Sequence, residues 1–184
     1  MKQLRYILKT MRPRQWPKNV FVFAALVFDR QLIAPESLLI TSFAFVLFCL
    51  ASSLVYIIND LTDIESDRLH PQKRHRPLAS GKLTKRTALI SIGVLAVLIF
   101  PVAFIIDLGL GLILSAYFIL MLAYSLWLKH VALIDLMIIA AGFVLRVAAG
   151  VVIIETQRFS PWLFVATTFL ALFIGLGKRR AEIH

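Results

Sequence analysis

Four carboxylates fall within eight positions at the end of a long apolar stretch, in the segment IINDLTDIESDRLHPQKRHRP, residues 57–77. On an α-helix, side chains four residues apart share a face. Asn59, Asp63 and Asp67 have this spacing, whereas Asp60 is rotated from Asn59 by about 100° and Glu65 lies on another side. If the helix continues two turns beyond its apolar part, the spacing predicts a stripe of three oxygen-bearing side chains.

An amide and two carboxylates make an oxygen-only ligand set, which suits a hard cation such as Mg²⁺. Bound Mg²⁺ usually keeps several waters and shares oxygens with substrate phosphates. We therefore expect Asn59, Asp63 and Asp67 to bind Mg²⁺, with Asp60 behind them and Asp63 and Asp67 acting in catalysis. The alternative is an acidic helix end that pairs with the basic loop after it, because acids near a helix C-terminus oppose the helix dipole.

Basic and tyrosine side chains near this stripe are candidates for binding substrate phosphates. Cations grouped beside carboxylates can form a phosphate clamp, although each one alone could equally serve membrane topology. Tyr56 lies one turn before Asn59 on nearly the same side of the helix, and its alternative role is that of an interfacial aromatic. The candidates are Lys18, Tyr56, Lys73, Arg74, Arg76, Lys129 and Arg146.

Arg146 differs from the other cations because it lies inside an apolar stretch. A charge there costs about 2.5 to 3.5 kcal/mol on insertion scales, so the side chain is expected to face the bundle interior or a wet cavity. Asp135, eleven residues earlier, returns to nearly the same helix face but about 16 Å away, which is too far for direct pairing. Contact with substrate and contact with a buried structural partner both remain open for Arg146.

The elements that must position these residues are membrane-spanning helices. The chain has 184 residues, of which 60% are hydrophobic, well above the usage of about 45 to 50% in soluble domains. Stretches of roughly 20 apolar residues are long enough to cross a bilayer. They predict an all-α integral membrane protein, a helix bundle with six spans at 17–35, 37–58, 87–106, 108–128, 131–154 and 160–177, the first interrupted by Asp29, Arg30 and Gln31.

The distribution of charge argues against nucleic acid as a partner and for the bilayer. The net charge is +10, but 17 of the 20 Lys and Arg residues precede the first span, occupy the loop after the second, or follow the fourth and sixth. Positive charge of this kind marks the cytoplasmic side, so we expect the N-terminus and the acid-motif loop to be cytoplasmic. A single cysteine, Cys49, excludes an internal disulfide, and the four histidines lack zinc-type spacing. The N-terminal segment has no cleavage site of the signal-peptide kind.

Several motifs resemble those of the UbiA superfamily of intramembrane prenyltransferases. NDLTDIESD, residues 59–67, fits that family's first aspartate-rich motif, N-D-x-x-D-x-x-x-D, and the basic segment HPQKRHRPLASG follows it. RPRQWPKN before the first span and YSLWLKH at the end of the fourth also look like family elements. The resemblance implies a UbiA-like helix bundle with the acid motif at its cytoplasmic face.

Within the superfamily, RPRQWPKN, GFVLRVAAG and GKRRAE look most like the branch that moves phosphoribose onto a polyprenyl (decaprenyl) phosphate. That branch implies a Mg²⁺-dependent transfer from 5-phosphoribosyl diphosphate at the bacterial cytoplasmic membrane, for cell-envelope polysaccharide precursors. The aromatic prenyltransferases of the family have a second aspartate motif after the sixth helix. In this chain that place contains GLGKRRAEIH, with Glu182 as its only acid.

Such enzymes usually have about nine helices, so we expect this chain, a single domain over 1–184 with a catalytic loop at 61–86, to lack a C-terminal part. Three alternatives to phosphoribosyl transfer remain open. One is a UbiA-type prenyl transfer from a polyprenyl diphosphate to an aromatic acceptor. The others are not enzymatic: an inactive fragment, or a transporter component whose pathway is lined by Arg146 and Asp135.

Overall fold

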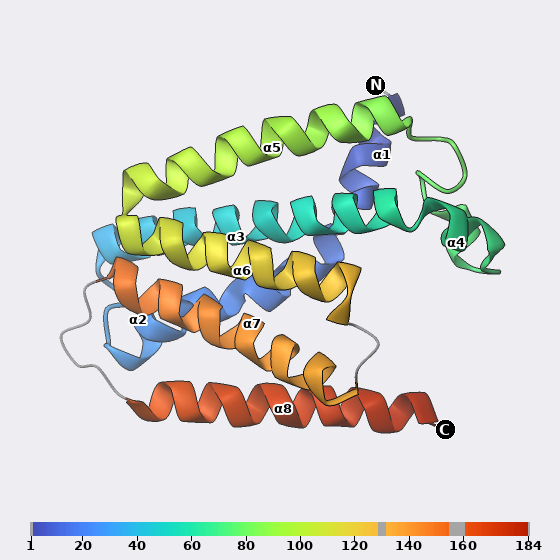
Figure 1. The fold of residues 1–184 in the computed structure, drawn as a ribbon. Helices are drawn as coiled ribbons and strands as arrows, with labels where there is room; N and C mark the ends of the chain where they lie inside the picture. Colours follow the sequence, from blue (N-terminus) through green and yellow to red (C-terminus); the bar gives the residue numbers. More distant parts are fainter. Residues whose placement is uncertain (1, 129–131, 155–160, 184) are drawn as a thin grey trace.

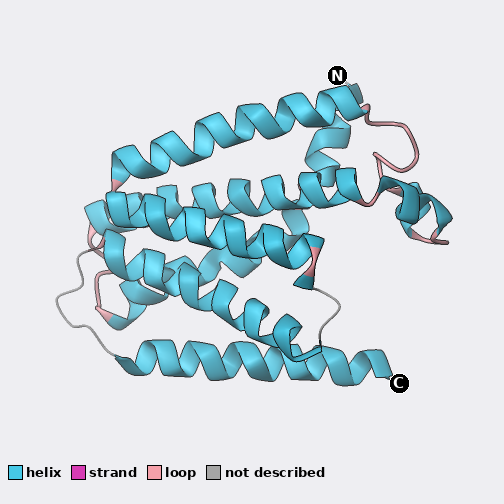
Figure 2. Cartoon of the chain, viewed as in Figure 1, coloured by secondary structure: helices cyan, strands magenta, loops and turns pink. Residues whose placement is uncertain are grey.

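The computed structural model describes residues 2–128, 132–154 and 161–183, and these residues form helices joined by short loops (Figure 2). The α-helices and 3₁₀-helices (η) are, in chain order, α1 Lys2–Thr10, η1 Pro13–Phe23, α2 Ala24–Phe28, α3 Pro35–Thr62, α4 Ile64–Leu69, η2 Lys73–His75, α5 Lys85–Ile106, α6 Leu108–Leu126, α7 Ala132–Ile153 and α8 Pro161–Ile183.

The long helices lie side by side in one bundle, with α8 at its edge against α7 (Figure 1). In the described part of the chain, four helical stretches are long and apolar enough to cross a membrane, and a shorter apolar stretch, Pro161–Gly177, lies in α8. The four are Pro35–Thr62, Lys85–Ile106, Leu108–Leu126 and Ile134–Ile153. The expected all-helical membrane architecture is confirmed.

The first predicted span, 17–35, is wrong as a continuous α-helix. The chain there forms the 3₁₀-helix η1, then the short helix α2, and turns away after Phe28. Pro17 lies inside η1 and has no N–H to donate, and Arg30 has a left-handed backbone with φ 59°. A continuous α-helix over the whole range is therefore interrupted near both ends.

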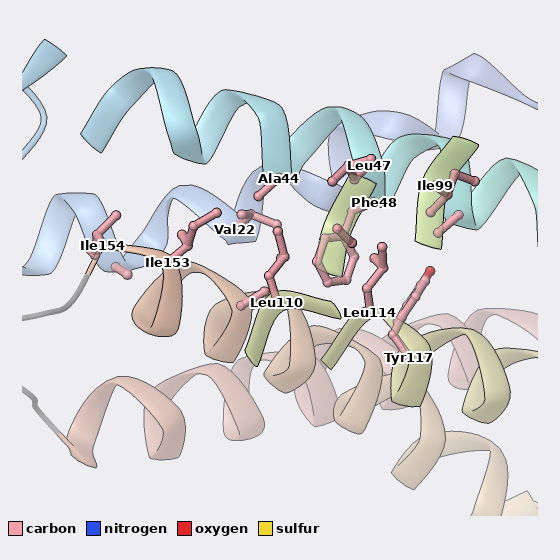
Figure 3. Close-up of a cluster of buried hydrophobic side chains, with 14 of the residues drawn as sticks. Val22, Ala44, Leu47, Phe48, Ile99, Leu110, Leu114, Tyr117, Ile153 and Ile154 are labelled. Carbon is pink, nitrogen blue, oxygen red and sulfur yellow. The ribbon is translucent and has the colours of Figure 1, made fainter. Parts of the chain in front are cut away.

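The main hydrophobic core surrounds α3 (Figure 3). Phe48 of α3 is fully buried and its ring lies 5.2 Å from that of Tyr117 in α6, centroid to centroid. Leu110 and Leu114 of α6 add to this cluster, as does Val22 of η1. The broken first segment is thus packed inside the bundle with the long helices.

Close approach of η1 to α7 depends on Gly150. A Cβ atom at this position would lie 2.1 Å from the carbonyl oxygen of Val22. No side chain can occupy that space, because the neighbouring atom belongs to the backbone. The glycine therefore lets η1 lie against α7 at the level of the core.

The loop between α3 and α5 is folded and carries the acid motif to one end of the bundle. Thr62 and Ser66 donate side-chain hydrogen bonds to the carbonyls of Asn59 and Asp63, a pattern that bends helices. A second hydrophobic cluster underlies the loop, and it comprises Met11, Ile57, Ile64, Leu78, Leu83 and Ala88. The side chain of Thr84 then accepts a hydrogen bond from the Thr87 amide and caps α5. The N-terminus and the end of α6 lie at this same end (Figure 1).

Candidate active site

Two buried carboxylates of the acid motif meet at one arginine. Asp60 is 2% exposed and Asp67 is 3% exposed. Nη1 of Arg76 lies 3.2 Å from Oδ1 of Asp60 and 2.7 Å from Oδ2 of Asp67. Asp60 also accepts a hydrogen bond of 2.6 Å from Nη2 of Arg12. The four side chains form an alternating acid–base cluster, in which guanidinium groups balance carboxylates that are withdrawn from water.

Arg12 reaches this cluster from the turn between α1 and η1. Its backbone is left-handed, with φ 53° and ψ 61°, a conformation uncommon for residues other than glycine. Its guanidinium carbon lies 4.6 Å from the ring centroid of Tyr56, within the range of a cation–π contact. The ion pair with Asp60 and the ring of Tyr56 thus hold Arg12 at an uncommon backbone conformation, of a kind that often occurs at functional sites.

The predicted stripe of Asn59, Asp63 and Asp67 is not formed by one continuous helix. Asp63 is the junction at which α3 ends and α4 begins, with φ −90° and ψ 9°. Asn59 instead faces α6, where its Oδ1 accepts a hydrogen bond from Ser125. Asp60, expected behind the stripe, lies close to Asp67, because the two carboxylates share Arg76.

Two carboxylates of the acid motif lie close enough together to share one positive partner, which in this structure is the Arg76 guanidinium. Asp60 and Asp67 each place an oxygen within 3.2 Å of one nitrogen atom, so their carboxylates converge on a single positive centre. Among the described residues, no group of three acidic, histidine or cysteine side chains could hold a metal by itself. Asp60 and Asp67 could hold Mg²⁺ only together with waters and substrate phosphate oxygens.

The other predicted phosphate-binding residues lie at different places. Arg76 belongs to the acid–base cluster, and the ring of Tyr56 contacts its Arg12. Lys73 and Arg74 are exposed in η2, and neither forms an ion pair with any residue that the structure describes. Lys18 is exposed on η1, and Lys129 lies outside the described residues.

Arg146 is buried, at 7% exposure, in a polar network inside the bundle. Its Nε donates to Oδ1 of Asn19 at 2.7 Å, and Nη2 donates to the Tyr117 hydroxyl at 2.8 Å. Nη1 donates to the carbonyl of Gly142 at 2.6 Å. The expectation that Arg146 faces the interior is confirmed, and its partners in the described structure are neutral groups of η1, α6 and α7.

Asp135 pairs with a tyrosine of α6, and it does not contact Arg146, as the sequence spacing had predicted. Its Oδ1 accepts a hydrogen bond of 2.6 Å from the hydroxyl of Tyr124, which belongs to the YSLWLKH motif. This contact joins the end of α6 to the start of α7. It does not pair Asp135 with Arg146.

Sequence reasoning missed four residues that complete these contacts, namely Arg12, Asn19, Tyr117 and Ser125. Arg12 and Asn19 are the first and last residues of the RPRQWPKN motif, and this motif was a signal for a role in the site. Ser125 lies in the YSLWLKH motif, but its contact with Asn59 joins residues 66 positions apart, and Tyr117 lies in none of the quoted motifs.

Taken together, the fold and the site define a multi-pass helical membrane protein with an acid–base cluster at one end of its bundle. A model of the UbiA prenyltransferase family matches residues 19–177. This chain belongs to the UbiA prenyltransferase family, which confirms the resemblance found in the motifs.

Individual relatives agree with this membership. The chain is 38% identical over 186 residues to a decaprenyl-phosphate phosphoribosyltransferase of Mycolicibacterium smegmatis, covering 97% of this chain and 57% of that protein. It is also 38% identical over 186 residues to a decaprenyl-phosphate phosphoribosyltransferase of Corynebacterium glutamicum, covering 96% of this chain and 54% of the relative. The chain thus spans little more than half the length of these relatives.

Among solved structures, the fold is similar to that of a UbiA homolog from Archaeoglobus fulgidus bound to GPP and Mg²⁺. The TM-score is 0.71 at 22% sequence identity, and the match covers 91% of this chain and 60% of that one. At this identity the similarity establishes the fold.

Proposed function

We propose that this protein takes part in Mg²⁺-dependent transfer of phosphoribose from 5-phosphoribosyl diphosphate to a polyprenyl phosphate, such as decaprenyl phosphate. The observation that carries the proposal is the convergence of Asp60 and Asp67 on Arg76 where α3 ends and α4 begins. A site that groups carboxylates with guanidinium groups suits a substrate with a diphosphate and a metal. Relatives at 38% identity are named decaprenyl-phosphate phosphoribosyltransferase, which supports transfer of a phosphoribosyl group to such a lipid.

In the proposed reaction, a phosphate oxygen of the lipid attacks the anomeric carbon of the ribose. A carbon–oxygen bond to the lipid phosphate forms as the bond to the diphosphate breaks, with inversion at that carbon. The nucleophile is already an anion, so the protein need not supply a strong base. Its task is to hold two anionic substrates together and to stabilise the charge that gathers on the leaving diphosphate.

The residues of the acid motif are assigned to the metal. Asn59, Asp63 and Asp67 would hold Mg²⁺, and Asp60 is an additional candidate because it shares Arg76 with Asp67. When bound, Mg²⁺ supplies charge neutralisation for the departing diphosphate.

The cationic residues are assigned to the phosphates. Arg76 is within reach of the diphosphate because it lies at the carboxylates. Lys73 and Arg74 are exposed on the same loop, and the ring of Tyr56 lies against Arg12 of the cluster. Lys18, Lys129 and Arg146 remain candidates for the lipid phosphate.

The placement in the membrane follows from charge. The N-terminus and the loop 61–86 lie at one end of the bundle, where most Lys and Arg residues of the sequence occur (Figure 1). We assign this end to the cytoplasmic side of a bacterial inner membrane, and residues 1–184 to one domain. The product would serve cell-envelope polysaccharide synthesis.

A product assay tests the proposal. Membranes are prepared from cells that express the gene and are given radiolabelled 5-phosphoribosyl diphosphate and polyprenyl phosphate. The label is then measured in the lipid that organic solvent extracts. We expect incorporation with Mg²⁺ and none with chelator. Transfer of a prenyl diphosphate to an aromatic acceptor would instead support the other UbiA chemistry, and no transfer of either kind would support a role that is not enzymatic.

A further inference from the structure

The N-terminal helix α1 has one face that packs on the protein. Tyr6 and Ile7 pack against the second hydrophobic cluster beneath the loop, and Thr10 is buried. Nε2 of Gln3 donates a hydrogen bond of 3.1 Å to the carbonyl of Lys82, just before α5. These contacts fix which sides of α1 point outward.

The outward surface of α1 carries a pair of leucines and, beside them, a stripe of basic residues. Leu4 and Leu8, one turn apart, are 62% and 46% exposed. Lys2, Arg5 and Lys9 follow on the adjoining face at 100° per residue, and all three are exposed. The helix contains no acidic residue, and within the described chain none of the three cations forms an ion pair.

The orientation of α1 matches an interface between membrane and water. Figure 1 shows α1 crossing α3 and α5 at a steep angle, where the long helices run along the bundle. It contacts both helices near the end that carries the acid motif. A helix at this position lies roughly in the plane of the membrane surface, where exposed leucines can enter the acyl boundary and cations can meet lipid headgroups.

We propose that α1 is an interfacial anchor that docks on anionic phospholipid headgroups. The three cations and the absence of acids on the helix select an anionic surface, and the two leucines select a lipid surface. The proposal does not depend on the proposed function, because it concerns only α1 and the bilayer.

Docking of α1 also bears on the acid–base cluster. α1 ends at Thr10, and Arg12, two residues later, pairs with Asp60 at 2.6 Å. A helix held on the membrane restricts the turn from which Arg12 extends. Anionic lipid should therefore steady the segment 11–16 together with α1.

Amide hydrogen exchange in lipid nanodiscs tests both statements. The full-length protein is compared in discs of phosphatidylcholine alone and in discs that also contain phosphatidylglycerol, with α3 amides as the internal reference. Since each Lys or Arg near an anionic surface adds appreciable attraction, we expect exchange in residues 2–10 to be roughly tenfold slower in the anionic discs. Residues 11–16 should slow in the same discs.

Two matched triple variants distinguish the effect of the α1 cations from that of other basic residues at the same end of the bundle. K2Q/R5Q/K9Q should lose the difference between the discs. K82Q/K85Q/R86Q removes the same charge from exposed positions at the start of α5 and should keep the difference.

A third variant tests the role of the two exposed leucines. L4S/L8S should exchange faster in both kinds of disc. Equal exchange of the wild-type α1 in both discs, or loss of the difference in both triple variants, would refute docking of α1. A response in residues 2–10 without one in 11–16 would refute the link to Arg12.

Discussion

Replacing Asp60 by asparagine removes the charge at the centre of the acid–base cluster and keeps the size of the side chain. Asp60 is 2% exposed and pairs with two guanidinium groups, of Arg12 and Arg76. In D60N, Arg76 retains Asp67 as a partner, but Arg12 has no carboxylate left. The variant therefore leaves one cation unbalanced beside a buried site.

The size of the effect follows from burial. Removing one partner of a fully buried pair costs about 3 to 5 kcal/mol. The side chains of Arg12 and Arg76 are 30% and 24% exposed, so water reaches both and the penalty is smaller. We expect D60N to lower the free energy of unfolding by about 2 kcal/mol. E65Q is the control, because Glu65 is 77% exposed and its pair with Arg68 contributes at most about 0.5 kcal/mol.

Reversible unfolding in mixed micelles measures both variants, and R12Q completes a double-mutant cycle with D60N. Because the two side chains act on each other, the loss in R12Q/D60N should be smaller than the sum of the single losses by about 1 kcal/mol or more. Additive losses, or a D60N loss no larger than that of E65Q, would refute the account of the cluster.

Four further variants test Asp63, two glycines and Arg146. D63N should abolish Mg²⁺-dependent transfer of phosphoribose while E65Q keeps most of it, and equal losses would exclude a special role for Asp63. G150A should lower the free energy of unfolding by about 1 to 3 kcal/mol, since the new methyl meets a backbone carbonyl at 2.1 Å. G93A, where nothing lies within 4 Å, should raise it by about 0.5 to 1 kcal/mol. R146M should destabilise by about 2 to 4 kcal/mol in the same assay, because it leaves buried acceptors without their donor; a neutral effect would show that the network contributes nothing.

Hydrophobicity predicted the long helices well, because in a bilayer the backbone must form its hydrogen bonds internally and apolar length sets where a helix runs. The stretch predicted at 87–106 is helix Lys85–Ile106, and the one at 131–154 is Ala132–Ile153. The stretch 17–35 failed because apolar content alone does not register that Pro17 cannot donate a hydrogen bond and that the chain turns at Arg30.

The site was predicted in its composition and only partly in its geometry. Spacing grouped Asn59, Asp63 and Asp67 and set Asp60 behind them, but it assumed an unbroken helix, whereas α3 ends and α4 begins at Asp63. The partner that holds Asp60 comes from Arg12, which is 48 residues away in sequence. Periodicity within one segment contains no information about such a contact, so the pairing required the tertiary structure.

The most direct test of a divalent-cation site at the end of α3 is a titration with Mn²⁺, followed by electron paramagnetic resonance. The protein is titrated in the presence of 5-phosphoribosyl diphosphate as wild type, D67N and E65Q. One bound ion per wild-type chain, at least tenfold weaker in D67N and unchanged in E65Q, is the predicted result. Equal affinity in all three proteins would place the ion elsewhere and contradict the assignment of the acid motif.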